Sequence, residues 1–185
     1  MTSAAHIDQL PASNAELAVV GRSNVGKSSL INAIGGSDKL AMTSKTPGRT
    51  RLLNQFALDD HGTIVDCPGY GYAKASQSMR HSWQKMAEDY LLHREELLRI
   101  LVLVDGEIGP TKLDVQLLDW LRANELPLAL IATKHDKVKS SARDKRKREL
   151  AAGCEADPSE VVWVSASKGV GIDRLRGLIL AWLHE

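Results

Sequence analysis

The chain has 185 residues and a mass of 20.2 kDa, which fits one domain of ordinary size. Its formal net charge is +1, so the overall charge does not indicate a nucleic-acid-binding protein, and any such role must come from local basic clusters. Two cysteines, Cys67 and Cys154, are too few for a disulfide framework, and with no secretory signal or membrane-spanning run visible we expect a cytoplasmic protein.

Short apolar runs alternate with segments of helical period along the whole chain. The runs predict strands, and runs that are apolar on both faces are typical of a sheet covered on both sides. They lie at Leu17–Val20, Leu53–Leu58, Thr63–Asp66, Ile100–Val104, Leu128–Ala132 and Val161–Val164. Helices are predicted at Gly26–Ile34, Trp83–Leu91, Leu113–Leu121 and Gly171–Leu183. The alternation predicts a doubly wound α/β domain, whose ligands bind at the carboxyl ends of the strands.

The loop after the first predicted strand carries a phosphate-binding pattern. It reads Gly21-Arg22-Ser23-Asn24-Val25-Gly26-Lys27-Ser28 and opens a helix, as the G-x-x-x-x-G-K-[ST] pattern requires. Its glycines let backbone N–H groups turn around phosphate oxygens, and the helix amino terminus adds a favourable dipole. We expect Lys27 to pair with the β- and γ-phosphates and the Ser28 hydroxyl to ligate Mg²⁺. The alternative is a turn with a surface lysine, which the strand–loop–helix placement disfavours.

The segment Asp66-Cys67-Pro68-Gly69 ends a predicted strand and is a candidate for sensing the γ-phosphate. We expect Asp66 to hold a magnesium-bound water and the Gly69 N–H to contact the γ-phosphate. Without the phosphate loop a plain turn would be the better interpretation.

A second candidate switch, Gly48-Arg49-Thr50-Arg51-Leu52, lies between these two loops. Thr50 is the candidate for the second protein ligand of Mg²⁺, chosen over Ser44 and Thr46 because it sits best before the following strand. We expect the γ-phosphate to order both switch segments and hydrolysis to release them.

Two later loops indicate which base is bound. In Thr133-Lys134-His135-Asp136 the carboxylate can accept from guanine N1–H and the exocyclic amine, a donor pair that adenine lacks. The Lys134 stem can lie over the base, and Thr133 stands where many GTPases have asparagine. Backbone N–H groups of Ser165-Ala166-Ser167 can meet guanine O6. Alone, T-K-x-D is more often a solvated strand end, but the order of the loops predicts guanine.

These motifs together resemble the EngB GTPases, also called YihA or YsxC, of the TrmE-Era-EngA-EngB-Septin-like group. The resemblance covers about Leu10 to Leu183 and rests on GRSNVGKSS, TSKTPGRT, DCPGYGYAK, DVQLLDWL, TKHD and SASKG. The most specific element is D-x-P-G-Y-G-Y-A following T-P-G-R-T.

The resemblance implies a three-layer P-loop NTPase fold, a Ras-like G domain with a mixed six-stranded sheet whose second strand is antiparallel. The G domain is expected at residues 17–185, after a short amino-terminal arm at residues 1–16. The resemblance also implies a monomeric GTPase that acts in large ribosomal subunit assembly and is required for normal cell division and septation.

Catalysis is expected to involve Lys27, Thr50, Gly69 and Asn24. Tyr70 follows Gly69, at the place where Ras-type proteins have a water-orienting glutamine, and a phenol cannot position water as an amide does. We therefore expect slow hydrolysis unless another group stabilises the transition state. In related GTPases an asparagine placed like Asn24 helps to bind K⁺. The alternative is a loop residue that bonds its own backbone.

Basic residues gather in two places. The segment from Lys134 to Glu149 contains eight lysines or arginines and only three acidic residues, with Lys145–Arg148 at its centre. A second basic group surrounds the first candidate switch in the sequence: Lys39, Lys45, Arg49 and Arg51. Such clusters could engage ribosomal RNA in the large subunit, although a solvated helix face is the simpler interpretation. Two other functions stay open: a Ras-type signalling switch with protein partners only, and a P-loop kinase or ATPase.

Overall fold

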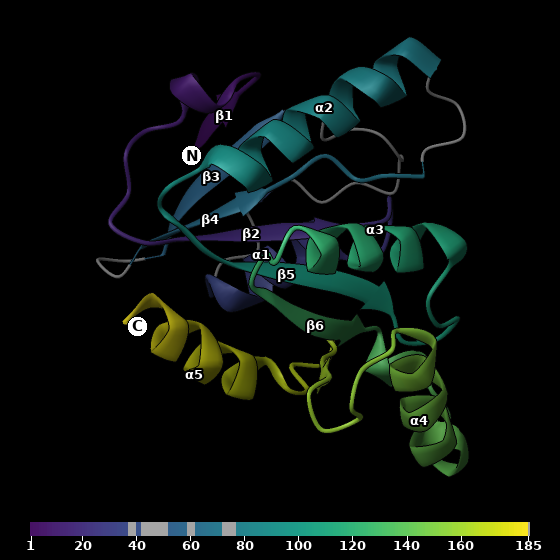
Figure 1. Ribbon diagram of the computed structural model, residues 1–185. Helices are drawn as coiled ribbons and strands as arrows, with labels where there is room; N and C mark the ends of the chain where they lie inside the picture. The colour runs from purple at the N-terminus through teal and green to yellow at the C-terminus, as the bar shows by residue number, and fades with distance from the viewer. Residues whose placement is uncertain (37–39, 42–51, 59–61, 72–76, 185) are drawn as a thin grey trace.

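Residues 1–36, 40–41, 52–58, 62–71 and 77–184 are described here from a computed structural model (Figure 1). Thr50, Gly48, Arg49 and Arg51 lie outside these residues, as do Lys39 and Lys45. Their predicted roles therefore remain predictions.

A mixed sheet runs through the middle of the molecule (Figure 1). Its strands are β1 (Thr2–Ala4), β2 (Glu16–Gly21), β3 (Leu53–Leu58), β4 (Gly62–Asp66), β5 (Leu97–Asp105), β6 (Leu128–Thr133) and β7 (Val162–Trp163). Their order in space is β1-β3-β4-β2-β5-β6-β7. Strands β4, β2, β5, β6 and β7 are parallel, whereas β3 is antiparallel to β4. All six predicted strands are confirmed. The expected antiparallel direction of the second predicted strand, which is β3, is confirmed as well.

The sheet has seven strands among the described residues, which corrects the expected number of six. The added strand is β1, which pairs antiparallel with β3 through Thr2 opposite Gln55 and Ala4 opposite Leu53. Three residues are too few to carry a hydrophobic period, so no sequence pattern distinguishes β1 from an irregular arm.

Five α-helices lie in the described part of the chain: α1 (Lys27–Ile34), α2 (Gln77–His93), α3 (Lys112–Ala123), α4 (Arg143–Gly153) and α5 (Ile172–Leu183). Four of them confirm predicted helices. The fifth, α4, was not among the predicted elements because it buries only Leu150 and Ala151 and has no apolar stripe. None of the described helices has the length and apolar character that a membrane crossing requires.

Helices cover both faces of the sheet, as the doubly apolar strands predicted (Figure 1). The side chains of β2 are shared between the two faces of the sheet, since neighbouring residues in a strand point to opposite faces. Ala18 and Val20 pack in the cluster that includes α2 and α3, and Leu17 and Val19 pack in the cluster that includes α1 and α5. The sheet is therefore the middle layer of three, and its strand ends are left to loops.

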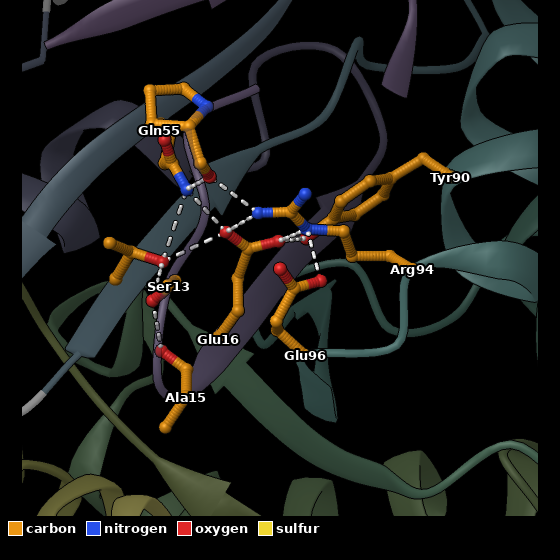
Figure 2. A network of polar contacts seen from close by, with 9 residues as sticks. Ser13, Ala15, Glu16, Gln55, Tyr90, Arg94 and Glu96 are labelled. Atoms are coloured by element: carbon orange, nitrogen blue, oxygen red, sulfur yellow. Dashed lines mark hydrogen bonds and ion pairs between the residues drawn. The ribbon is translucent and has the colours of Figure 1, made fainter. Parts of the chain in front are cut away.

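A buried polar network joins elements at the amino end of β2 (Figure 2). The Glu16 carboxylate is fully buried, and it accepts hydrogen bonds from Tyr90 Oη at 2.9 Å and Arg94 Nε at 2.9 Å. Its other oxygen accepts from Gln55 Nε2 at 2.6 Å and Thr63 Oγ1 at 2.8 Å. One carboxylate thus ties β2, β3, β4 and the end of α2 together, at the end of the sheet opposite the predicted ligand loops.

Candidate nucleotide-binding site

The phosphate loop leaves the carboxyl end of β2 and turns directly into α1. Two of its residues adopt left-handed backbone conformations, Asn24 with φ 65° and Gly26 with φ 111°. Gly26 is the N-cap of α1 and offers no side chain, so the first N–H groups of the helix have no side-chain cap. The predicted strand–loop–helix context is present, and these donors suit an anion such as phosphate.

Lys27 and Asp66 form a charged pair at the floor of the site. Lys27 Nζ lies 3.9 Å from Asp66 Oδ1, and both side chains are buried. Burial raises the pKa of Asp66 to about 6, although the Lys27 charge works in the opposite direction. Within the described structure Asp66 Oδ1 has no hydrogen-bond partner, so a buried acceptor remains available beside a buried cation.

The segment after β4 lies against the phosphate loop. The Ser23 N–H donates to the Tyr70 carbonyl at 2.9 Å, and the Ser23 hydroxyl donates to the Gly69 carbonyl at 3.4 Å. A Cβ on Gly69 would come within 3.0 Å of Lys27 Nζ and 3.1 Å of the Ser23 nitrogen. A side chain at this position would require its neighbours to shift by a few tenths of an ångström, because the Gly69 backbone lies close beside the predicted phosphate-binding lysine.

The loop after β6 is braced against the phosphate loop by Thr133. Its hydroxyl donates to the Val25 carbonyl at 2.7 Å, and its side chain is buried. Replacing the usual asparagine by threonine therefore leaves a hydrogen bond between the two loops.

A carboxylate that the sequence analysis missed orients Lys134. Asp105 ends β5, and its Oδ2 accepts from Lys134 Nζ at 2.7 Å, while Oδ1 accepts from the Glu107 N–H at 3.0 Å. The parallel register aligns Asp105 with Thr133 across β5 and β6. An acidic residue at the carboxyl end of a predicted strand was the signal that could have revealed it.

Asp136 is held by the loop that follows β7. The Ser165 hydroxyl donates to Asp136 Oδ1 at 2.7 Å and lies 3.2 Å from the Ser167 hydroxyl. The Ser165 hydrogen bond is the largest of the effects that lower the pKa of Asp136 below its ordinary value. The carboxylate is thus kept ionised, as an acceptor for guanine must be.

The remaining predicted residues are placed as follows. The His135 ring packs edge-on against Trp163, with ring centroids 5.5 Å apart, and its backbone N–H group donates to the Val164 carbonyl. Cys67 and Pro68 are buried beside Asp66, while Ala166 is half-buried and Leu52 is exposed before β3. Hydrogen bonds therefore link the phosphate loop with the segment after β4 and with the loop after β6, which the loop after β7 contacts in turn.

The comparisons with known proteins agree with this geometry. A family model described as 50S ribosome-binding GTPase matches residues 16–134. Two relatives are each called probable GTP-binding protein EngB. The one from Mannheimia succiniciproducens is 42% identical over 100% of this chain and 92% of its own length. The one from Streptococcus pyogenes is 44% identical over 90% of this chain and 82% of its own length.

Solved structures give the same result. A crystal structure of a probable GTP-binding protein EngB matches with a TM-score of 0.75 and 26% identity, covering 92% of this chain and 99% of that one. Aquifex aeolicus Era bound to GDP and AlF4⁻ matches with a TM-score of 0.74 and 29% identity, covering 92% and 57%. Era in complex with MgGDPNP and a 16S ribosomal RNA fragment matches with a TM-score of 0.72 and 28% identity, covering 91% and 56%.

The fold, the linked loops and these matches define a class, the Ras-like P-loop GTPases, which hydrolyse GTP to GDP. Within that class the chain belongs to the EngB family of GTP-binding proteins.

Proposed function

We propose that this GTPase is a nucleotide-dependent switch in the assembly of the large ribosomal subunit, acting in the cytoplasm as a monomer. The observation that carries the proposal is the match of residues 16–134 to a 50S ribosome-binding GTPase model. We extend it to normal cell division and septation, because growth depends on the supply of ribosomal subunits.

The proposed roles of the site residues follow from the contacts described above. The amides of Gly21–Ser28 bind the α- and β-phosphates, and Lys27 neutralises charge on the β- and γ-phosphates. Gly69 contacts the γ-phosphate, and Asp136 binds the guanine edge with Lys134 along the base. Ser165–Ser167 both orient Asp136 and offer amides to guanine O6. Support comes from the hydrogen bonds that join these loops.

Mg²⁺ is the proposed metal, and the residues present fit it. Asp66 offers a buried oxygen without a hydrogen-bond partner in the described structure, which suits a water on the ion, and Ser28 stands in the first turn of α1. Ser28 and Thr50 are the proposed protein ligands. The bound ion would supply positive charge between the β- and γ-phosphates. Era, one of the structural neighbours, was solved with MgGDPNP.

K⁺ is proposed as a further activating ion through Asn24. Asn24 is exposed in a left-handed conformation, so its side chain is available to a ligand. Turnover is expected to be faster in K⁺ than in Na⁺, and Asn24→Ala should abolish the difference. Equal rates of the unmodified protein in both salts would remove this part of the proposal.

The proposed RNA-binding surface is α4, which lies at the end of the molecule toward which β5 and β6 point (Figure 1). Lys145 and Arg148 are exposed, and Lys147 and Arg148 form no ion pair with any described residue. A helix that buries almost none of its surface, and that carries lysine and arginine side chains without acidic partners in the described structure, suits a polyanionic partner. The helix begins soon after Asp136, so it is close in sequence to the base-binding loop.

Co-sedimentation with purified large ribosomal subunits tests the proposal. The chain should pellet with large subunits in the presence of GDPNP and much less with GDP, and small subunits serve as the control. Equal pelleting with both nucleotides, or none, would contradict the proposal and favour a signalling switch that acts through proteins only.

A further inference from the structure

Tyr70 makes a second contact that no predicted role uses. Its phenol donates to Asp114 Oδ1 at 2.6 Å, although Asp114 belongs to α3 and is 44 residues away in sequence. Asp114 is 2% exposed. Its other oxygen accepts from the Thr111 N–H and the Thr111 hydroxyl, each at 2.6 Å, in a capping box that begins α3. Oδ1 is therefore satisfied by Tyr70, and a buried carboxylate oxygen needs such a donor.

The main chain of Tyr70 is bound to the phosphate loop at the same time. Its carbonyl accepts the Ser23 N–H at 2.9 Å, and Arg22 and Tyr70 form a parallel bridge. Tyr70 therefore connects the phosphate loop, through its backbone, with α3, through its side chain. Gly69 lies between this anchor and Asp66, beside Lys27 Nζ.

The segment from Gly69 to Gly71 borders open space on one side. A cavity of about 450 Å³ lies between α2 and α3, and its wall includes Gly69, Tyr70 and Gly71 on one side and Leu117 and Trp120 on the other. Side chains that border open space have fewer van der Waals partners to hold them. On the side away from the cavity, the hydrogen bonds of Tyr70 hold the segment, together with the Ser23 hydroxyl that donates to the Gly69 carbonyl.

The phenol is suited to a permanent donor role. Burial, and then the Asp114 carboxylate, raise the pKa of Tyr70 well above its ordinary value. It consequently stays protonated at any physiological pH. Gly71 follows with φ 75°, a conformation that favours glycine, and a Cβ there would lie 3.3 Å from the Arg22 and Leu113 side chains.

We propose that Tyr70 is a positioning residue, whose hydrogen bond to Asp114 holds the Gly69 backbone beside Lys27 so that it can contact the γ-phosphate. Recognition of the third phosphate is thereby linked to the start of α3. The proposal deepens the role given to Gly69 above, and it does not depend on any ribosomal partner.

The test replaces Tyr70 by phenylalanine, which keeps the ring and removes the donor. Affinity for GDPNP and the turnover number for GTP should each fall about tenfold, the effect of losing one hydrogen bond to a charged group. Affinity for GDP should stay within about twofold, because the β-phosphate loop is unchanged. Unaltered GDP binding also shows that the variant is folded.

The chain supplies a matched control in Tyr90. Its phenol also donates to a buried carboxylate, that of Glu16 at 2.9 Å, but at the opposite end of the sheet. Tyr90→Phe should lower the melting temperature and leave the ratio of GDPNP to GDP affinity unchanged.

Asp114→Asn provides the second arm, since it removes the charge and keeps the size of the side chain. If the two residues act as a pair, combining it with Tyr70→Phe should add little to the loss caused by Tyr70→Phe alone. The proposal is overturned if Tyr70→Phe leaves GDPNP affinity unchanged, weakens GDP and GDPNP equally, or does no more than Tyr90→Phe. If only this ratio of GDPNP to GDP affinity fails to change as expected, the Gly69 contact itself still stands, whereas failure of GDPNP to bind the unmodified chain would remove both proposals.

Discussion

At the scale of single residues, the candidate site is held together by short hydrogen bonds between loops that are distant in sequence. The Thr133 hydroxyl donates to the Val25 carbonyl and so joins the loop after β6 to the phosphate loop. Ser165 donates to Asp136 and so favours the ionised carboxylate. The first contact fixes the position of a loop, and the second fixes the Asp136 carboxylate. Because both exist without nucleotide, binding has to order fewer groups.

Ser165→Ala should shift the pH dependence of guanine binding. Asp136 is proposed to bind guanine as a carboxylate, and the Ser165 hydrogen bond is the largest cause of its lowered pKa. Affinity of the unmodified protein for fluorescent GDP should therefore hold as pH falls and drop only below the ordinary range of an aspartate. Without the hydroxyl the pKa rises, so the loss should begin at higher pH.

Titrating fluorescent GDP between about pH 3 and pH 6 measures this shift, since the ordinary aspartate pKa is about 3.9. Ser159→Ala is the control, because Ser159 is exposed and its hydroxyl contacts Asp157 away from the site. Identical pH profiles for Ser165→Ala and the unmodified protein would show that the hydroxyl does not tune Asp136.

At the scale of elements, the two ends of the sheet differ in how they are held. The amino end of β2 is fixed by Glu16 and its donors (Figure 2). The carboxyl ends carry the loops of the site. This arrangement suits the proposed switch, in which the loops respond to the nucleotide while the opposite end of the sheet stays fixed.

Arg94→Ala should destabilise the protein by about 3 kcal/mol, because a buried carboxylate would be left without its cation. Arg94 is 8% exposed and also donates to the Pro11 carbonyl, so the amino-terminal segment would lose an anchor as well. Urea unfolding measures the change, with Lys85→Ala at an exposed position of α2 as control. A destabilisation no larger than that of the control would mean that solvent or another cation satisfies Glu16.

Replacing Lys145, Arg146, Lys147 and Arg148 by alanine should weaken binding to large ribosomal subunits and flatten its salt dependence. For every RNA phosphate that the variant no longer binds, the slope of log affinity against log salt should fall by about 0.7 to 0.9. A variant carrying Lys85→Ala and Arg174→Ala, two exposed positions on other helices, serves as control. Equal binding and equal slopes for both variants would exclude α4 as the RNA-binding surface.

Sequence reasoning reached most of the fold because strands buried on both faces leave unbroken apolar runs, as in β2 and β5. It missed β1, which is too short for a pattern, and α4, whose exposed surface has no stripe. The site loops were found where local motifs carry them. Asp105 and Asp114 were missed because their roles depend on partners 29 and 44 residues away, which only the folded chain brings together.

At the scale of the whole molecule, four linked loops at the carboxyl ends of the described strands are proposed to form a site for guanine nucleotides. Displacement of fluorescent GDP from the purified chain by GTP, GDP and ATP, with Mg²⁺ present, measures this directly. GTP and GDP should compete at similar concentrations, and ATP should require at least about 1,000-fold more, because Asp136 has no donor pair to meet on adenine. Equal competition by ATP, or no binding of labelled GDP, would contradict this assignment of the site.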